Sequence, residues 1–248
     1  MRILVCAAHP NEMKSIKSSL KSLEIFDANI DFLQLWMGSY ETIHNLTKYL
    51  EKNKPDFLVN IWICWQRGDY GELIQIWRII NSADKELLVP IVFEYAKISS
   101  IICLESMARI LDDLRWEDYA DMESYGVEFI ASKYQIPRLI LKLPADKIWQ
   151  GFDKSLLKTS ADKLSHIDYK DLMGRIINFD KAQFKPKDNT YIQQAYRFTF
   201  QEFEIMKFKI NKYEALTKKD FKNFYELNKY LTKIDFLQEL EKIFSFDS

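Results

Sequence analysis

The stretch Asp121-Met122-Glu123-Ser124-Tyr125-Gly126 brings a methionine and a glutamate into an apolar part of the chain. A strand-like apolar run follows at residues 137–143 and leads into Pro144-Ala145-Asp146. A carboxylate in a core-facing segment costs free energy unless it meets hydrogen-bond donors. The hydroxyl groups of a sugar can supply such donors. Glu123 is therefore a candidate for binding a sugar.

Around this stretch, strand-like and helix-like patterns alternate over the first two thirds of the chain. The expected strands are 3–8, 30–36, 57–65, 71–80, 88–94 and 138–143, and the expected helices are 10–23, 39–53, 107–114, 119–134 and 161–178. Continuous apolar runs such as 3–8 are typical of strands buried on both faces of a sheet. The alternation predicts an α/β fold in which a mainly parallel, twisted central sheet is flanked by helices.

The composition changes near residue 182, where a polar segment that contains Pro186 predicts a linker. We expect an α/β domain at 1–182 and a C-terminal helical extension at 183–248. In the extension, Thr217 and Thr232 each precede an aspartate by three residues, which is close to a helix-capping box. Apolar residues that need an apolar partner surface gather largely on one side of its last helices: Phe221, Phe224, Tyr225, Leu227 and Leu231.

The overall composition favours a cytoplasmic protein. A net charge of −1 argues against a general nucleic-acid binder, and the aromatic residues of the extension therefore predict core or interface packing. Cys6, Cys64 and Cys103 lie among apolar neighbours and outside any Cys/His cluster, so we expect reduced core residues and neither a metal nor a cofactor. The apolar start is too short for a signal peptide, and no apolar run approaches the roughly 20 residues of a membrane span.

Five segments together resemble the nucleoside phosphorylase and nucleosidase superfamily, which breaks N-glycosidic bonds of purine nucleosides. They are RILVCAAHPNEM at 2–13, KPDFLVN at 54–60, GELIQI at 71–76, DMES at 121–124, and IPRLILK at 136–142 with Asp146 after it. The pattern is similar to that of the methylthioadenosine/adenosylhomocysteine nucleosidases. The resemblance covers about residues 1–180, and the spacing from DMES to Asp146 is its most specific part.

The resemblance implies a role for each of three acidic residues. Glu12 would position and activate the attacking water, Glu123 would hold the ribose hydroxyl groups, and Asp146 would protonate the leaving base. Glycosidases commonly use two carboxyl groups in this way, one for the water and one for the leaving group. The other predicted substrate-binding residues are Met122, His9 and Gly38. We expect the three carboxyl groups to converge on one cleft that binds a small nucleoside.

The resemblance also implies a homodimer, and we expect the helical extension to pack on its own α/β domain and to add to the dimer interface. Two departures from the family pattern leave the activity open. Trp62 and Trp65 stand where the family has a glycine-rich turn, and Ala145 replaces the serine before Asp146. The chain is either a purine nucleosidase or a catalytically inactive nucleoside-binding or interaction protein on the same fold. Phosphorolysis is disfavoured, because no glycine-rich anion loop lies near an arginine.

Simpler interpretations stand beside these roles. Asp146 would cap a helix that begins near Lys147, Glu12 would be a surface residue in the first turn of a helix, and His9 would be a hydrogen-bonded loop residue. The remaining histidines, His44 and His166, are expected at the solvated surface. Four tryptophans are expected in the core, with stacking of one of them on a base as the alternative: Trp36, Trp62, Trp65 and Trp77.

Overall fold

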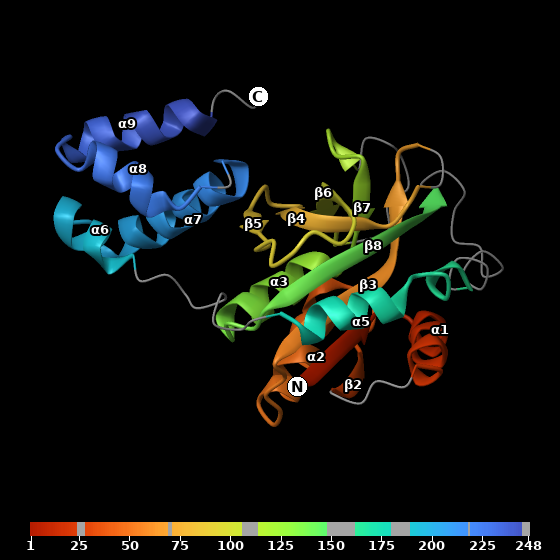
Figure 1. Ribbon diagram of the computed structural model, residues 1–248. Helices are drawn as coiled ribbons and strands as arrows, with labels where there is room; N and C mark the ends of the chain where they lie inside the picture. Colours follow the sequence, from red (N-terminus) through yellow and green to blue (C-terminus); the bar gives the residue numbers. More distant parts are fainter. Residues whose placement is uncertain are drawn as a thin grey trace. The chain divides into compact units, whose positions relative to one another are not determined.

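The computed structural model describes residues 1–23, 28–68, 71–105, 114–147, 162–179, 189–217 and 219–244. The chain divides into two compact units, Met1–Phe184 and Lys185–Ser248. Each unit has its own hydrophobic core. In Figure 1, the described part of the first unit contains strands and helices, and the described part of the second unit is helical.

The described residues of the first unit form one eight-stranded sheet. Its strands are β1 (Arg2–Ala7), β2 (Asn29–Gln34), β3 (Phe57–Gln66), β4 (Ile74–Asn81), β5 (Glu86–Leu88), β6 (Lys97–Cys103), β7 (Tyr119–Asp121) and β8 (Arg138–Lys147). The order is β2-β1-β3-β7-β6-β4-β5, and β8 pairs with both β3 and β4. Five pairs are parallel (β1–β2, β1–β3, β3–β8, β4–β6 and β6–β7) and three are antiparallel (β3–β7, β4–β5 and β4–β8). The predicted, mainly parallel sheet is therefore confirmed.

Helices flank this sheet, as predicted (Figure 1). They are α1 (Pro10–Lys21), α2 (Ser39–Leu50), α3 (Ser124–Lys133) and α5 (Tyr169–Ile177). In α1 the buried residues Met13, Ile16 and Leu20 recur at helical spacing and join the core of the unit. β3 is buried along nearly its whole length, which agrees with its continuous apolar run.

Helices α2 and α3 approach each other closely at Gly126. A Cβ atom on Gly126 would lie 2.7 Å from the carbonyl oxygen of Ser39 and 3.0 Å from Cγ2 of Thr42. We expect Gly126→Ala to lower the free energy of unfolding by about 1–3 kcal/mol, because the two helices must separate. Chemical denaturation measures this change.

Gly174 in α5 provides the matched control. A Cβ atom there would meet no other atom within 4 Å, so Gly174→Ala should leave stability unchanged or raise it by up to about 1 kcal/mol through helix propensity. Equal stability of the two variants would contradict a tight contact at Gly126.

The sheet departs from the predicted elements in its second half. The predicted strand at 88–94 is wrong, since β5 ends at Leu88 and the next strand is β6. Strand β6 mixes serine with apolar residues and is held by its pairing with β4, which a local pattern does not reveal. The predicted helix at 107–114 falls almost wholly on residues 106–113, which lie outside the described residues.

The predicted helix at 119–134 consists of two elements. Tyr119–Asp121 form β7, which pairs with β6 and β3, and α3 begins only at Ser124. This correction places Met122 and Glu123 in the turn between a strand and a helix. The predicted helix at 161–178 is also interrupted: residues 162–164 are helical, and α5 begins only after Asp168, whose carboxylate accepts the N–H of Asp171 at 3.0 Å.

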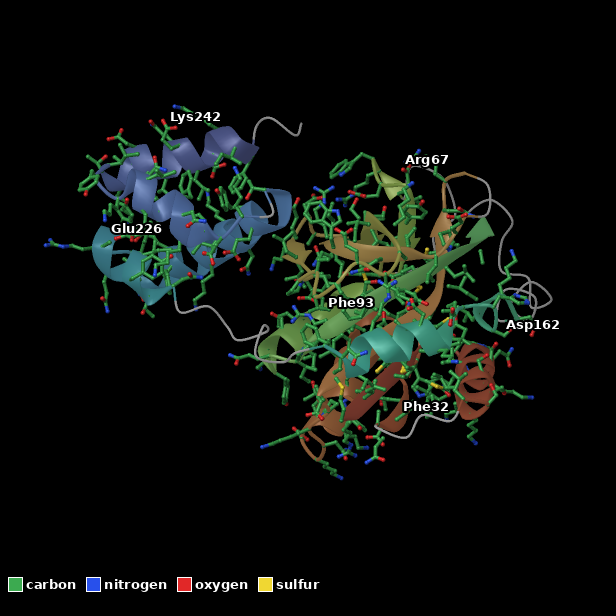
Figure 2. The ribbon with its side chains drawn as sticks, in the orientation of Figure 1. Phe32, Arg67, Phe93, Asp162, Glu226 and Lys242 are labelled. Atoms are coloured by element: carbon green, nitrogen blue, oxygen red, sulfur yellow. The ribbon has the colours of Figure 1, made fainter. Side chains whose placement is uncertain are left out.

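The second unit is built on aromatic packing. Its helices are α6 (Thr190–Tyr196), α7 (Phe200–Thr217), α8 (Phe221–Asn228) and α9 (Lys233–Phe244). The rings of Tyr196, Phe221 and Phe224 each pack against the buried ring of Phe236. The predicted core packing of these aromatic residues is confirmed, but Leu227, which was assigned to the same apolar side, is 82% exposed. Charged side chains such as Glu226 and Lys242 lie on the outside of the helices (Figure 2).

One of the two predicted caps in this unit is present. At α9 the N–H of Asp235 donates to Oγ1 of Thr232 at 3.3 Å. At α8 the prediction is wrong, because Thr217 ends α7 and Asp220 caps α8 by accepting the N–H of Lys222 at 2.8 Å. Among the described helices, none combines the length and the apolar character that crossing a membrane requires.

Candidate active site

Predicted site residues lie in the turns that follow three strands of the first unit. Glu12 lies in the first turn of α1 after β1, Gly38 lies between β2 and α2, and Glu123 lies between β7 and α3. In open α/β sheets, ligands bind in the crevice outside the carboxyl ends of the strands. The location is therefore suited to a ligand site.

Glu12 is buried and fixed by backbone donors. Its carboxylate accepts the N–H of His9 at 2.8 Å and the N–H of Ile63 at 3.3 Å, and the residue is only 5% exposed. His9 completes a capping box, since its Nδ1 accepts the N–H of Asn11 at 3.2 Å. The surface interpretation of Glu12 is therefore wrong, and the hydrogen-bonded interpretation of His9 is confirmed. Burial lowers the pKa of His9, which favours its neutral form at pH 7.

Glu123 is held in the same manner at the start of α3. Its carboxylate accepts the N–H of Gly38 at 3.0 Å and the N–H of Met122 at 3.2 Å, and the residue is 6% exposed. Burial, followed by the negative charges of Asp121 and Glu12, raises the pKa of Glu123 to about 8, against the opposing effects of Lys142 and the Gly38 N–H.

Gly38 has a backbone reason to be glycine. Its φ of +101° lies in a region that favours glycine, and this conformation presents its N–H to Glu123. The neighbouring hydroxyl of Ser39 donates to the carbonyl of Met122 at 2.9 Å and lies 3.3 Å from Sγ of Cys103. These contacts fix the turn that carries Glu123, and the sequence pattern had not pointed to Ser39 or Cys103.

A buried ion pair lies directly behind this turn. Nζ of Lys142 in β8 is 2.7 Å from Oδ2 of Asp121, and both side chains are almost fully buried. Lys142 also donates to Oδ1 of Asn60 at 3.1 Å. The other oxygen of Asp121, Oδ1, is buried and has no hydrogen-bond partner among the described residues. Lys142 had not been singled out, although a lysine within the apolar run of β8 was a signal for it.

Trp62 is part of the same cluster. Its ring lies 3.8 Å from Nζ of Lys142, and its indole N–H donates to Oδ2 of Asp121 at 3.2 Å. Trp62 is buried, which confirms the core interpretation for this residue. The Trp62 side chain, which stands where a glycine-rich turn was expected, thus packs on the Asp121–Lys142 ion pair.

Asp146 lies in β8, and its backbone pairs with that of Trp65. The helix-cap interpretation is therefore wrong, because β8 continues through Lys147 where a helix was expected. Leu143, three residues earlier, pairs with Ile63, whose N–H binds Glu12. The backbone of Asp146 thus approaches the Glu12 end of the sheet. Its side chain and residues 148–161 lie outside what the structure describes.

The remaining predictions for tryptophan and histidine have mixed outcomes. Trp36 is not a core residue, since it is 55% exposed and adopts a left-handed backbone conformation with φ of 66° just before Gly38. Trp65 and Trp77 are half-buried. His44 and His166 are exposed, as expected. In the described part of the chain, no group of three or more His, Cys, Asp or Glu residues could hold a metal ion.

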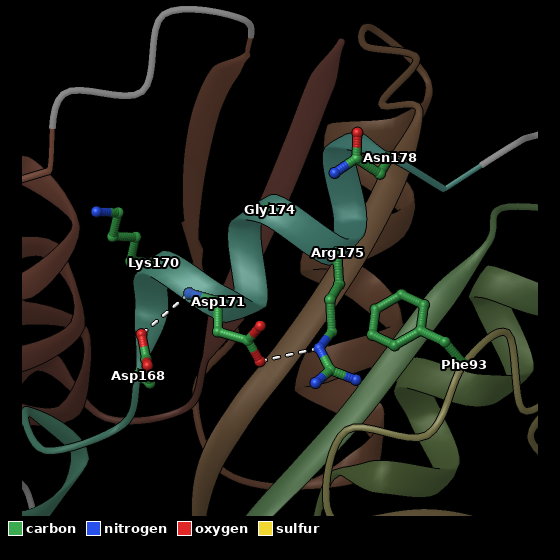
Figure 3. Close-up of a pocket in the computed structure, with 7 residues that line it drawn as sticks. All are labelled: Phe93, Asp168, Lys170, Asp171, Gly174, Arg175 and Asn178. Carbon is green, nitrogen blue, oxygen red and sulfur yellow. Dashed lines mark hydrogen bonds and ion pairs between the residues drawn. The ribbon is translucent and has the colours of Figure 1, made fainter.

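A separate surface pocket of about 660 Å³ lies along α5 and contains none of the predicted site residues (Figure 3). Its lining residues are Phe93, Asp168, Lys170, Asp171, Gly174, Arg175 and Asn178. Asp171 and Arg175 form an ion pair at 2.9 Å, and Arg175 also donates to the carbonyl of Glu94 at 3.1 Å. These groups are exposed and satisfy one another, so the turns around Glu12 and Glu123 are the better candidate site.

Comparison with known proteins shows the fold. No protein-family model and no curated protein matches the chain. Among solved structures, an MTAN of Chlamydia trachomatis bound to MTA has a TM-score of 0.57 at 16% identity, over 73% of this chain and 100% of that chain. The futalosine hydrolase mutant of Helicobacter pylori has a TM-score of 0.58 at 10% identity, over 71% of this chain and 99% of that chain.

A third similar structure is a putative 5′-methylthioadenosine/S-adenosylhomocysteine nucleosidase from Francisella philomiragia, with a TM-score of 0.58 at 14% identity, over 70% of this chain and 99% of that chain. The matched share is close to the size of the first unit. The chain thus has a nucleoside phosphorylase and nucleosidase-like fold. The resemblance found in the sequence is confirmed at this level, with strong divergence.

Proposed function

We propose that the protein hydrolyses the N-glycosidic bond of a purine nucleoside. The observation that carries this proposal is the burial of two carboxyl groups, Glu12 and Glu123, each fixed by two backbone N–H groups. Burying acidic groups is costly, and a site that keeps them is suited to binding hydroxyl groups and to stabilising positive charge. The shared fold with nucleosidases supports the same chemistry.

The charge of the site suits the reaction. Among the described residues of the site, the acidic groups Glu12, Asp121 and Glu123 outnumber the one basic group, Lys142. Hydrolysis of a glycosidic bond builds positive charge on the sugar ring in the transition state. A negative, buried environment stabilises that charge more strongly than water does.

In the proposed reaction, a water attacks C1′ of the ribose while Glu12 accepts its proton. The bond from C1′ to the base breaks, and its electron pair leaves with the base. Asp146 would donate a proton to the leaving purine, and Glu123 would bind the ribose hydroxyl groups with Met122 against the sugar. His9 and Gly38 would support the site through their backbone N–H groups, which bind Glu12 and Glu123. The products are the free base and the freed sugar.

A catalytically inactive nucleoside-binding protein is the second candidate. It is favoured by Trp62, whose buried ring occupies the strand where the family has a glycine-rich turn. As part of the first proposal, the enzyme is a cytoplasmic homodimer. Its ligand is a small nucleoside, and it has no nucleic-acid or membrane partner.

Release of free base from a panel of nucleosides tests the choice between these functions. With adenosine, 5′-methylthioadenosine, inosine and uridine, we expect free base from the purine nucleosides and equal rates with and without phosphate. Chromatographic separation of base from nucleoside measures it. A requirement for phosphate would indicate phosphorolysis. Binding of nucleoside in calorimetry without any release of base would favour the inactive protein.

A further inference from the structure

Lys142 is an unusual residue for its place in the fold. It lies in β8 with Leu141 before it, and its side chain is fully buried. Three partners surround its ammonium group: the carboxylate of Asp121 at 2.7 Å, the amide oxygen of Asn60 at 3.1 Å and the ring of Trp62 at 3.8 Å. Lysine is almost never fully buried in proteins unless it is paired. The ammonium group of Lys142 is enclosed by all three of these partners.

Stability alone does not account for this arrangement. Buried ion pairs are often no more stabilising than apolar residues of similar volume, because both charges lose their hydration. Asp121 also collects donors on one oxygen, since Oδ2 accepts the indole N–H of Trp62 and the N–H of Ser124 as well. The other oxygen has no partner among the described residues. The Asp121–Lys142 pair therefore costs desolvation free energy. Asp121 lies only two residues before Glu123 in the chain.

We propose that Lys142 is a positioning residue that acts on Glu123 through space, so that together with Asp121 it sets the charge of the Glu123 carboxyl group. This charge decides whether Glu123 accepts a hydrogen bond from a ligand hydroxyl or donates one. The inference deepens the proposed function and rests on it only for the identity of the ligand.

The groups that face Glu123 act on it in opposite directions. Burial raises the pKa of Glu123 most, and the charges of Asp121 and Glu12 also raise it. The ammonium of Lys142 and the N–H of Gly38 lower it. Cys103 stays a neutral thiol, because burial raises its own pKa. The Asp121 effect exceeds the Lys142 effect, so the two charges leave a net upward shift.

Four variants test the opposite directions in which Asp121 and Lys142 change the pKa of Glu123. Asp121→Asn removes a negative charge and keeps an acceptor for Trp62, so the pKa of Glu123 should fall on the order of one pH unit. Lys142→Met should raise it by a similar amount, and Lys142→Arg should restore the value of the unchanged protein. The double variant D121N/K142M should titrate between Asp121→Asn and the unchanged protein, because both opposing effects are lost.

The titration is measured by carbon NMR of the full chain labelled with ¹³C in its glutamate carboxyl groups, and Glu123→Gln assigns the signal. Circular dichroism checks that each variant is folded. A buried charge without its partner can prevent folding of Lys142→Met or Asp121→Asn, and the neutral double variant then carries the test. The inference is overturned if every folded variant, the double variant included, titrates at the same pH as the unchanged protein.

Binding of 5′-methylthioadenosine, measured by calorimetry across pH, links the titration to the site. Its pH dependence should move with the Glu123 titration in each variant. The NMR titration does not need a ligand, so a protein that releases no base still tests the role of Lys142. A shifted titration without any nucleoside binding would support the charge relation and count against the proposed function.

Discussion

Replacing Glu12 by glutamine is expected to slow the release of free base by about 10²–10⁴-fold, which is the usual contribution of a positioned general base. The amide cannot take a proton from the attacking water. Its oxygen can still accept one of the two backbone N–H groups that hold Glu12, from His9 and Ile63, so the start of α1 should keep its place. The initial rate of base release from 5′-methylthioadenosine measures the loss, and KM should change little.

Glu41→Gln is the matched control for this variant. Glu41 also lies in the first turn of a helix, α2, but it is exposed. We expect its replacement to leave the rate unchanged, since the site does not depend on it. A rate for Glu12→Gln that equals the rate for Glu41→Gln would show that another group activates the water, and the role assigned to Glu12 would be lost.

The part of the fold that could be predicted is the part that local sequence determines. The continuous apolar runs of β1 and β3 follow from burial on both faces of the sheet, and the helix starting at Pro10 follows from its spacing. Strand β6 was missed because its pairing with β4 holds it, and such pairing is not visible in seven residues of mixed character. Strand β7 was predicted as part of a helix, because a strand of three residues is too short to show an alternating pattern.

The candidate site divides in the same way. Glu12 and Glu123 could be found, because an acidic residue that directly follows a strand-like run, or sits within an apolar stretch, is unusual in a core. The Asp121–Lys142 pair could not, since Asp121 on β7 and Lys142 on β8 meet only because both strands pair with β3. Trp36 was assigned to the core for its size, but the left-handed turn at its backbone leaves it exposed.

Arg138→Met should lower the free energy of unfolding by about 3–5 kcal/mol, because it leaves a buried charge without a partner. Arg138 in β8 and Glu128 in α3 are both buried, and Nε of Arg138 donates to Oε2 of Glu128 at 2.7 Å. A second guanidinium nitrogen bonds the other carboxylate oxygen. Chemical denaturation at pH 7 measures the loss. The double variant E128L/R138M should recover most of it, because apolar residues of similar volume often replace a buried ion pair without cost.

The pH dependence of the single variant separates a lost charge partner from lost packing. Burial raises the pKa of Glu128 above its ordinary value, and Arg138 lowers it, so removing the arginine raises it further. The folded state then binds a proton that the unfolded state releases, and stability falls as pH rises between the two pKa values. The deficit of Arg138→Met should therefore shrink toward pH 4.5 and be largest at neutral pH. A deficit that stays constant with pH would assign the loss to packing. Because α3 begins beside Glu123, a variant that keeps its fold at low pH should also keep the turn that holds this carboxyl group.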